Sequence, residues 1–225
     1  VRQHVNPLSR YFQLAKELPR TNQIFFNDSL PLHLDIGSAK GRFLIDLAQI
    51  DPNRNYLGVE IRQSLVIYGE KVRERLDLNN LKFLFCNANV SLEDWLLNLK
   101  PNQLQMVSIQ FPDPCFKRKH FKRRVLQPSL LISLTKALNK GSELFIQSDI
   151  YEVVKTMSQL IEASNCFVRK NKDETKWGIG SPFKVMTERE EYVENCNMPV
   201  FRELYVRNGI NPPSLSMFKD DYAIM

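Results

Sequence analysis

The chain alternates short apolar runs with longer stretches of helical periodicity, and this alternation constrains its fold more than any other feature. Short apolar runs are typical of buried strands, and strands that alternate with helices predict a mostly parallel α/β sheet. With 225 residues, the chain is long enough for one such domain with a full core. We therefore predict a single domain over residues 1–225, with helices flanking a seven-stranded, mostly parallel sheet. The expected strands are Leu32–Ile36, Tyr56–Ile61, Lys82–Cys86, Met106–Phe111, Glu143–Ser148, Cys166–Lys170 and Pro199–Val206.

Helices are expected between these strands, and local end signals support several of them. Pro128 suits the first turn of one helix, and Ser91 can cap another, with Asp94 three residues on. Residues 1–30 are polar and irregular, and residues 171–190 are predicted to form a substrate loop, because they are polar and rich in glycine. The expected helices are Arg42–Ile50, Ser64–Leu76, Leu92–Leu99, Ser129–Asn139 and Glu152–Ser164.

Composition narrows the class of protein. The hydrophobic fraction of 43% and the charged fraction of 25% are those of an ordinary globular domain. No apolar run approaches the ~20 residues of a membrane span, so we expect no membrane partner. The chain starts without an initiator Met or a signal-peptide core, and the default expectation is a cytoplasmic protein. The net charge of +6 is compatible with a nucleic-acid partner without singling it out.

The four cysteines, Cys86, Cys115, Cys166 and Cys196, are too dispersed for a metal site or a disulfide framework. None forms a Cys-x-x-Cys pair, and the three histidines are equally scattered. We therefore expect reduced thiols and no bound metal. Cations near Cys115 could lower the pKa of its thiol, although simple packing also explains this residue.

The first expected strand runs into a glycine-containing turn, Asp35–Gly41, directly before a helix. Glycines at such a junction, here Gly37 and Gly41, let the backbone approach a nucleotide-like ligand closely. The turn lacks the second glycine of the dinucleotide fingerprint and the Gly-Lys-Ser/Thr end of a P-loop. It suits S-adenosylmethionine better, because Asp35 can meet the α-ammonium group of that molecule.

Polar side chains also end the next two expected strands. Glu60 follows the glycine turn by about 20 residues, a position from which a carboxylate can accept both ribose hydroxyls. Asn87 closes the third strand, where its amide can hydrogen-bond the adenine edge. Each also has a simpler explanation. Glu60 could be a surface charge beside Arg62, and Asn87 could be an ordinary turn asparagine. Three polar strand ends in succession favour an adenosyl cofactor.

The stretch from Phe111 to Arg124 joins an acidic turn to a cluster of cations. Asp113 stands between two prolines at the end of the fourth expected strand, where α/β sheets bind ligands. The basic side chains that follow favour a polyanionic substrate, because lysine and arginine bind phosphates. A solvated basic loop after an ordinary turn is the alternative. The cluster comprises Lys117, Arg118, Lys119, His120, Lys122, Arg123 and Arg124.

Together these motifs resemble the bacterial-type tRNA (guanine-N7) methyltransferases. The resemblance spans nearly the whole chain in order, and F-P-D-P followed by K-x-x-H-x-K-R-R is its most specific block. It implies a Rossmann-like class I methyltransferase fold, S-adenosyl-L-methionine as methyl donor, and tRNA as substrate. The implied target is N7 of the variable-loop guanine, position 46 by tRNA convention. The matching segments are Arg2–Leu8, Asp35–Gly41, Gly58–Glu60, Phe111–Arg124 with Gln127-Pro128, and Thr187–Glu190.

The resemblance also implies roles for individual residues. We expect Asp113 to be the catalytic carboxylate, because methyl transfer to N7 moves positive charge onto the purine. Cofactor contacts are expected at Asp35, Gly37, Gly41, Glu60, Asn87 and Asp113. Substrate contacts are expected at Lys117, Lys119, His120, Lys122, Arg123, Arg124, Asp149, Thr187 and Glu190.

Three residues depart from the family pattern. Ala39 replaces the usual middle glycine of the cofactor loop, and Asn87 stands where some members have aspartate. Cys115 stands where the family commonly has tryptophan, which removes an aromatic surface near the substrate.

Other functions remain open from the sequence alone. A methyltransferase of the same fold could act on another guanine, in rRNA or in a cap. A small-molecule methyltransferase fits less well, because it has no use for the cation cluster. The chain could also be a non-catalytic RNA-binding protein with a vestigial cofactor fold. Such a protein would not bind S-adenosylmethionine, which distinguishes it from the methyltransferases. A dehydrogenase is disfavoured by the missing second glycine.

Overall fold

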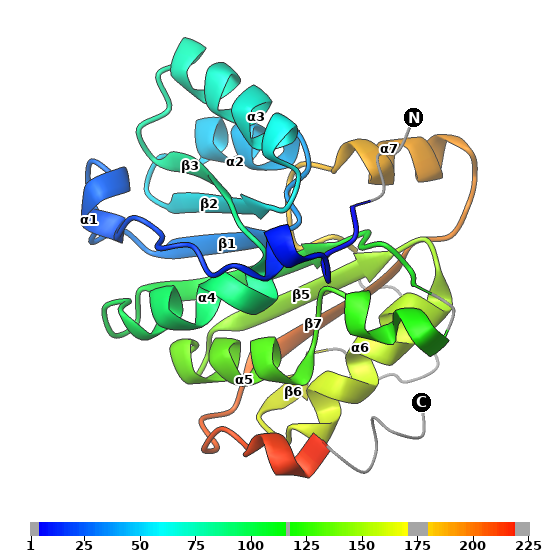
Figure 1. Cartoon of the computed structure of the whole chain (residues 1–225). Helices are drawn as coiled ribbons and strands as arrows, with labels where there is room; N and C mark the ends of the chain where they lie inside the picture. The colour runs from blue at the N-terminus through cyan, green and yellow to red at the C-terminus, as the bar shows by residue number, and fades with distance from the viewer. Residues whose placement is uncertain (1–4, 116–117, 171–179, 219–225) are drawn as a thin grey trace.

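The computed structural model describes residues 5–115, 118–170 and 180–218, and one sheet organises them. Its seven strands lie in the order β3-β2-β1-β4-β5-β7-β6 (Figure 1). The strands β1 to β5 pair in parallel, whereas β7 runs antiparallel to both β5 and β6. The predicted seven-stranded, mostly parallel α/β sheet is therefore confirmed. The strands are β1 (Leu32–Ile36), β2 (Asn55–Glu60), β3 (Leu81–Phe85), β4 (Leu104–Gln110), β5 (Glu143–Ser148), β6 (Phe167–Arg169) and β7 (Phe201–Arg207).

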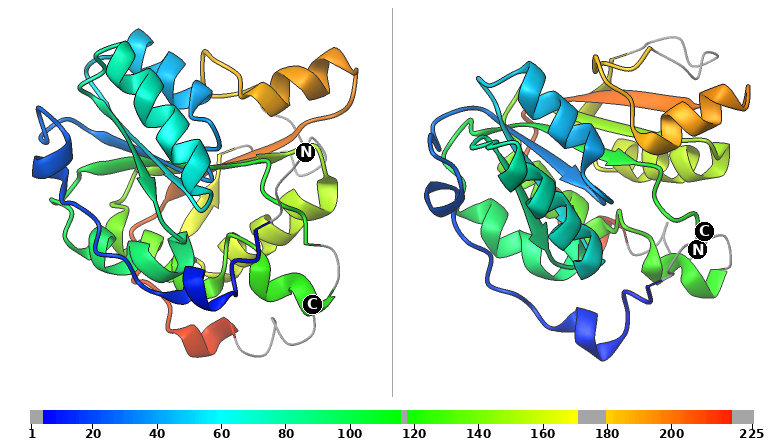
Figure 2. Two further views of the ribbon diagram at one scale, coloured as in Figure 1. Left: turned by 45° about the horizontal axis from the view of Figure 1, so that its top comes forward. Right: turned by 90° about the horizontal axis from the view of Figure 1, so that it is seen from above.

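Helices cover both faces of the sheet, as the views of Figure 2 show. On one face, α4, α5 and α6 contribute side chains such as Leu92, Leu131 and Val154 to the larger apolar core. On the other face, α2 and α3 enclose a second core around Phe43 and Phe83. None of these described helices has the length and apolarity needed to cross a membrane. The helices are α1 (Thr21–Ile24), α2 (Arg42–Ile50), α3 (Gln63–Arg75), α4 (Ala88–Leu97), α5 (Pro128–Ala137), α6 (Tyr151–Ala163) and α7 (Glu188–Asn195).

The chain segment before α7 also packs on the face of the sheet that α2 and α3 cover. The ring of Phe183 stacks on His33 at a centroid distance of 5.2 Å and meets Phe145 edge-on at 5.3 Å. Burial of this aromatic ring anchors the segment to the sheet. The helix that follows lies beside the start of α2, where Arg42 and Glu191 form an ion pair at 2.8 Å. The apolar anchor thus holds α7 near the strand ends.

Two predicted helix boundaries can be compared with the structure. The N-cap of α4 is Asn87, whose side chain accepts a hydrogen bond from the backbone of Asn89. Ser91 instead lies inside the helix and accepts a hydrogen bond from the backbone N–H of Lys16 at 3.1 Å. The predicted Ser91 cap is therefore wrong, because the helix starts four residues earlier, where Asn87 accepts from one of its free N–H groups. Pro128 occupies the first turn of α5, as predicted.

The segment predicted as a loop, residues 171–190, ends in helix α7. Residues 171–179 lie outside the described part of the chain. From Glu188 onward the chain is helical, because Thr187 and Glu190 form a reciprocal capping box. A threonine followed three residues later by glutamate is the sequence signature of this cap. The helix start was therefore visible in the sequence.

Candidate functional site

Five neighbouring parallel strands end at one edge of the sheet, each at a polar side chain predicted to bind a ligand. In the strand order β3-β2-β1-β4-β5, these residues are Asn87, Glu60, Asp35, Asp113 and Asp149. The order of connections reverses between β1 and β4, and α/β sheets bind ligands in the crevice at such a reversal. The fold thus gathers residues that are dispersed over more than half of the sequence.

Asp35 is buried and held by two donors from β4. Its Oδ1 accepts hydrogen bonds from Ser108 Oγ at 2.5 Å and from Gln110 Nε2 at 3.1 Å. Burial raises the pKa of Asp35 to about 6 against the lowering effect of these two bonds, and the charge of Glu60 adds to the rise. Among the described residues, no hydrogen bond ends on Oδ2 of Asp35. That oxygen is available to a cationic ligand.

Glu60 is buried, and both of its carboxylate oxygens are occupied. Oε1 accepts from the backbone N–H and from Nε of Arg62, both at 3.0 Å. Oε2 accepts from the backbone N–H of Ala39 at 3.0 Å and from Arg62 Nη2 at 3.1 Å. A carboxylate has about four lone-pair sites, so these donors fill it. A hydroxyl group could bind here only if the guanidinium of Arg62 moved away.

The two glycines of the first turn meet different needs. Both have positive φ, +89° at Gly37 and +80° at Gly41. A Cβ added to Gly37 would meet no atom within 4 Å, so open space lies beside the end of β1. At Gly41 the same Cβ would lie 2.2 Å from Cζ of Phe83. Gly37 therefore borders space for a ligand, whereas Gly41 makes room for the core.

Ala39, between these glycines, has φ of +51°. The left-handed region is strained for alanine by about 1 kcal/mol or more. A glycine, which the resemblance to the family leads us to expect here, would avoid this strain. The strain is offset in part, because the N–H of Ala39 reaches Glu60.

The amide of Asn87 is engaged with the N-terminal segment. Its Nδ2 donates to the backbone oxygens of Pro7 and Phe12, each at 3.2 Å, while its Oδ1 caps α4. Beside it, the ring of Tyr11 stacks on Phe85 at the end of β3 with centroids 6.3 Å apart. The N-terminal segment thus lies over the strand end where the adenine of a cofactor was predicted.

Asp113 is exposed in the turn after β4. It makes no hydrogen bond or ion pair with any other described residue. The turn is flanked by Phe111 with φ of +46° and Cys115 with φ of +44°, values that are rare for such side chains. Phe111 therefore leaves the strand to which the sequence assigned it, and its N–H donates to the backbone oxygen of Gln147 at 2.8 Å. The strained turn presents Asp113 at the crevice.

The thiol of Cys115 is partly buried beside Asp113. Burial and the charge of Asp113 raise the pKa of Cys115, and together they outweigh the opposing charges of Arg124 and Arg123. Of the two explanations considered for Cys115, the structure favours simple packing over activation by the nearby cations. All four cysteines are free thiols.

The cation cluster follows this turn as a 3-10 helix, Arg118–Arg123. Lys117, as well as the side chains of Arg118 and Lys119, lies outside the described part of the structure. Lys122 is exposed, and the guanidinium of Arg124 packs over the ring of Phe121 at 3.9 Å. Gln127 fixes the end of the cluster by donating to the backbone oxygens of Phe121 and Arg124 at 2.8 and 2.9 Å. His120 and Arg123 are partly buried within it.

The remaining predicted substrate residues are held by ion pairs and caps. Asp149 pairs with Arg189. Glu190 is only 1% exposed, and its carboxylate pairs with Arg202 at 2.7 Å. Thr187 donates its N–H to Glu190 and accepts the N–H of that residue, so the start of α7 is rigidly organised. These contacts place α7 next to the end of β5.

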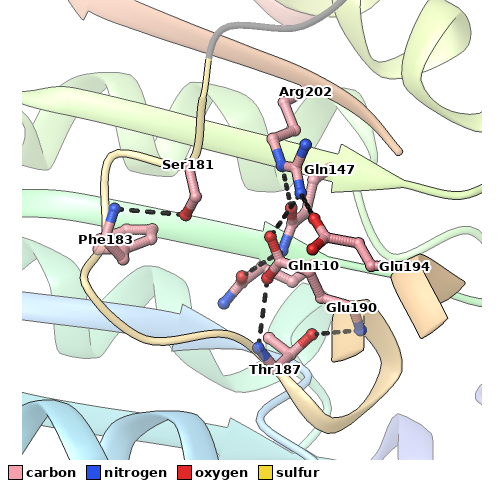
Figure 3. A network of polar contacts seen from close by, with 8 residues as sticks. All are labelled: Gln110, Gln147, Ser181, Phe183, Thr187, Glu190, Glu194 and Arg202. Carbon is pink, nitrogen blue, oxygen red and sulfur yellow. Dashed lines mark hydrogen bonds and ion pairs between the residues drawn. The ribbon is translucent and has the colours of Figure 1, made fainter. Parts of the chain in front are cut away.

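A row of polar residues on β4, β5 and β7 was not predicted from the sequence, and Figure 3 shows three of them, Gln110, Gln147 and Arg202. Ser108 lies in register with Asp35, Gln110 with Gln147, and Gln147 with Arg202. A signal was present, because Ser108 and Gln110 alternate with apolar residues in an otherwise buried strand. Polar side chains two residues apart share one face of the sheet and need partners there.

A hollow of about 790 Å³ opens at the opposite edge of the sheet, where the parallel strands begin. It is lined by the loops before β2, β4 and β5 and by Pro182, Phe183 and Lys184 of the predicted substrate loop, but by none of the individually predicted site residues. The chemistry gathered at the carboxyl edge is therefore the better candidate site. Within the described residues, no cluster of three or more His, Cys, Asp or Glu side chains could hold a metal ion.

Known structures support the fold. A crystal structure of an rRNA methylase from Streptococcus thermophilus superposes with a TM-score of 0.50, covering 84% of this chain and 92% of that protein. Its sequence is 12% identical, so the likeness concerns the fold alone. The predicted class I methyltransferase arrangement is thereby confirmed.

Sequence comparisons assign the chain to a family. Residues 29–203 match the family model described as "Putative methyltransferase". A protein of Prochlorococcus marinus (strain MIT 9313) named tRNA (guanine-N(7)-)-methyltransferase is 57% identical, covering 96% of this chain and 92% of that protein. A protein of the same name from Synechococcus sp. (strain CC9311) is 53% identical, with coverages of 96% and 91%. The chain therefore belongs to the tRNA (guanine-N(7)-)-methyltransferase family.

Proposed function

We propose that this enzyme transfers a methyl group from S-adenosyl-L-methionine to N7 of the variable-loop guanine of tRNA, at position 46. The observation that carries the proposal is the row of polar strand ends beside a cation cluster. The carboxylates suit an adenosyl cofactor with a free ammonium group, and the cations suit an RNA backbone. The names of the similar proteins support methyl transfer to guanine N7 of tRNA.

The residues of the carboxyl edge fit the cofactor chemically. Oδ2 of Asp35 would accept the α-ammonium group, and the open space at Gly37 would admit the ligand beside the backbone. Glu60 would accept the ribose hydroxyls once Arg62 moves away, and the polar end of β3 near Asn87 would face the adenine. When bound, the cofactor supplies a methyl group already activated by a sulfonium centre.

Catalysis by this site requires positioning more than proton transfer. Guanine N7 has an in-plane lone pair and no proton, so no strong general base is needed. Holding N7 in line with the methyl group at near-attack distance supplies much of the rate enhancement. Asp113 would stabilise the positive charge that develops on the purine. Asp113 is exposed and forms no ion pair with any residue that the structure describes, which leaves this carboxylate available for that role.

Base specificity would come from acceptors that only guanine satisfies. Asp113 and Asp149 would accept the N1–H and the 2-amino group of guanine, and adenine cannot donate in that pattern. Adenine would leave these acceptors unpaired, which disfavours it. Thr187 and Glu190 would lie at the other side of the base, on the start of α7.

Methyl transfer from labelled S-adenosylmethionine to unmodified tRNA tests the proposal directly. The wild-type transcript should accept label, and a transcript with adenine in place of the variable-loop guanine should accept none. Equal labelling of both would reassign the target to another guanine. The absence of label in either, together with retained tRNA binding, would favour the binding-only alternative.

The cation cluster should control the salt dependence of tRNA binding. Replacing both Arg123 and Arg124 with alanine removes two phosphate-binding charges, so the apparent KM for tRNA should rise. The slope of log K against log salt concentration should become shallower by about 1 to 2 units. Titrations over a series of salt concentrations measure this slope, and Lys136→Ala on α5 provides an exposed control. An unchanged slope in the double variant would show that these arginines do not contact phosphate.

A further inference from the structure

A continuous chain of hydrogen bonds joins the two ends of the candidate site, and Figure 3 shows the part of it that runs from Gln110 to Glu190. Gln110 Nε2 donates to Asp35 at 3.1 Å, and its Oε1 accepts from Gln147 Nε2 at 2.7 Å. The same Nε2 of Gln147 donates to Oε2 of Glu190 at 3.1 Å. Two glutamines thus bridge a carboxylate at the end of β1 and a carboxylate on α7.

The orientation of both amides is fixed by their partners. Gln147 Nε2 donates one N–H to Gln110 and the other to Glu190. Its Oε1 accepts from Arg202 Nε at 3.1 Å. Turning either amide around would place an oxygen against a carboxylate oxygen, with no proton between them. Gln147 is fully buried, so no water can replace a lost partner at little cost. The bridge therefore has one arrangement.

The bridge lies between residues with different proposed ligands. Asp35 would hold the cofactor, whereas Glu190 stands at the start of α7, which is proposed to lie beside the guanine. Glu190 is otherwise held by Arg202 and by the N–H of Thr187. A shift of α7 on RNA binding would therefore pull on Gln147, and through Gln110 on Asp35. Coupling of this kind needs no direct contact between the ligands.

We propose that Gln110 and Gln147 are positioning residues that couple the cofactor-side carboxylate to the substrate-side carboxylate, so that bound cofactor and bound tRNA strengthen each other. The proposal rests on the proposed function, because it takes S-adenosylmethionine and tRNA as the two ligands. It assigns a role to two residues whose side-chain amides hydrogen-bond other side chains of the site.

The titration of Asp35 reports on this bridge. The pKa of Asp35 is raised to about 6, chiefly by burial, and the donors Ser108 and Gln110 hold it down while Glu60 raises it. His33 contacts Ser108 at 2.8 Å, and burial lowers its pKa to about 3, so it carries no charge near neutral pH. Ligand binding that needs ionised Asp35 should weaken as pH falls through about 6. Removing the Gln110 donor should move this weakening to higher pH.

The experiment measures binding of S-adenosylhomocysteine, which keeps the α-ammonium group but cannot react. Affinity is determined with and without tRNA transcript, between about pH 5 and 8, for the wild type, Gln110→Leu and Gln147→Leu. The matched control is Gln105→Leu, an exposed glutamine on the same strand. Gln110→Asn keeps an amide on a shorter side chain and replaces the leucine variant if that one does not fold.

The wild type and the control should bind S-adenosylhomocysteine about tenfold more tightly with tRNA than without it. In Gln110→Leu and Gln147→Leu this ratio should fall close to one, and the acid midpoint should rise in Gln110→Leu. A wild-type ratio of one, or a ratio that both variants preserve, overturns the coupling but leaves the proposed function intact. A wild type that does not bind S-adenosylhomocysteine at any pH overturns the proposed function itself.

Discussion

Replacing Asp113 with asparagine should lower the turnover number for tRNA methylation by about a hundredfold or more. The substitution keeps the size and the hydrogen-bonding oxygen of the side chain but removes its negative charge. Because a positive charge develops on the purine during transfer, this charge is worth more in the transition state than in the bound ground state. The KM for tRNA should therefore change much less than the turnover number.

The fold of this variant should be unaffected. Asp113 is exposed and has no ion pair or hydrogen bond within the described structure, so no buried group loses a partner. Single-turnover kinetics at saturating tRNA and cofactor isolate the chemical step, and thermal unfolding checks the fold. The control is Asp94→Asn, because Asp94 is also an exposed aspartate but lies on α4. This variant should leave both the single-turnover rate and the thermal unfolding temperature unchanged. Near-normal turnover in Asp113→Asn would rule out the proposed role.

The strand ends were predictable because each combines an apolar run with a polar terminus. In β1, β2 and β3 the predicted strands and the structure agree to within a residue or two, and Asp35 and Glu60 are buried at their ends. Periodicity identifies buried strands well, since the alternative of exposing such runs to water is unfavourable. The parallel orientation of these strands then follows from the helices that connect them.

The contacts between strands were not predictable from the same pattern. Gln110 and Gln147 are 37 residues apart, and only the register of β4 against β5 brings their amides together. Arg62 could not be predicted to fill the acceptors of Glu60, because this contact depends on the backbone path after β2. Asn87 was expected at the cofactor, yet its amide binds the N-terminal segment, a partner 75 to 80 residues away. Such pairings depend on tertiary structure.

Replacing Gly41 with alanine should destabilise the protein by about 3 kcal/mol or more, which lowers Tm by about 6 to 12 °C. The φ of +80° strains any residue with a Cβ, and this Cβ would overlap the ring of Phe83. The ring has no free space to move into, because Gly58 and Gly69 also pack against it. A Cβ added at either position would lie 2.5 or 3.0 Å from the same ring.

Gly37→Ala is the matched control for this steric effect. Its φ of +89° gives a similar strain, about 1 to 2 kcal/mol, but its Cβ would meet no atom within 4 Å. Denaturant unfolding of both variants therefore separates strain from overlap. Adding Phe83→Leu should recover part of the loss in Gly41→Ala, since the atoms that overlap are those at the far end of the ring. Equal stability of the two alanine variants would show that the ring yields freely.

The same pair of variants distinguishes the packing role of the turn from its binding role. The Cβ of Gly37→Ala would enter the open space beside Asp35, which is where the cofactor is proposed to approach the backbone. Cofactor affinity should therefore fall in Gly37→Ala by about tenfold or more, although this variant is the more stable of the two. In Gly41→Ala the loss should be mainly of stability, with affinity retained by the folded fraction. A turn with two positive-φ glycines would then combine two constraints, one imposed by the core and the other by the ligand.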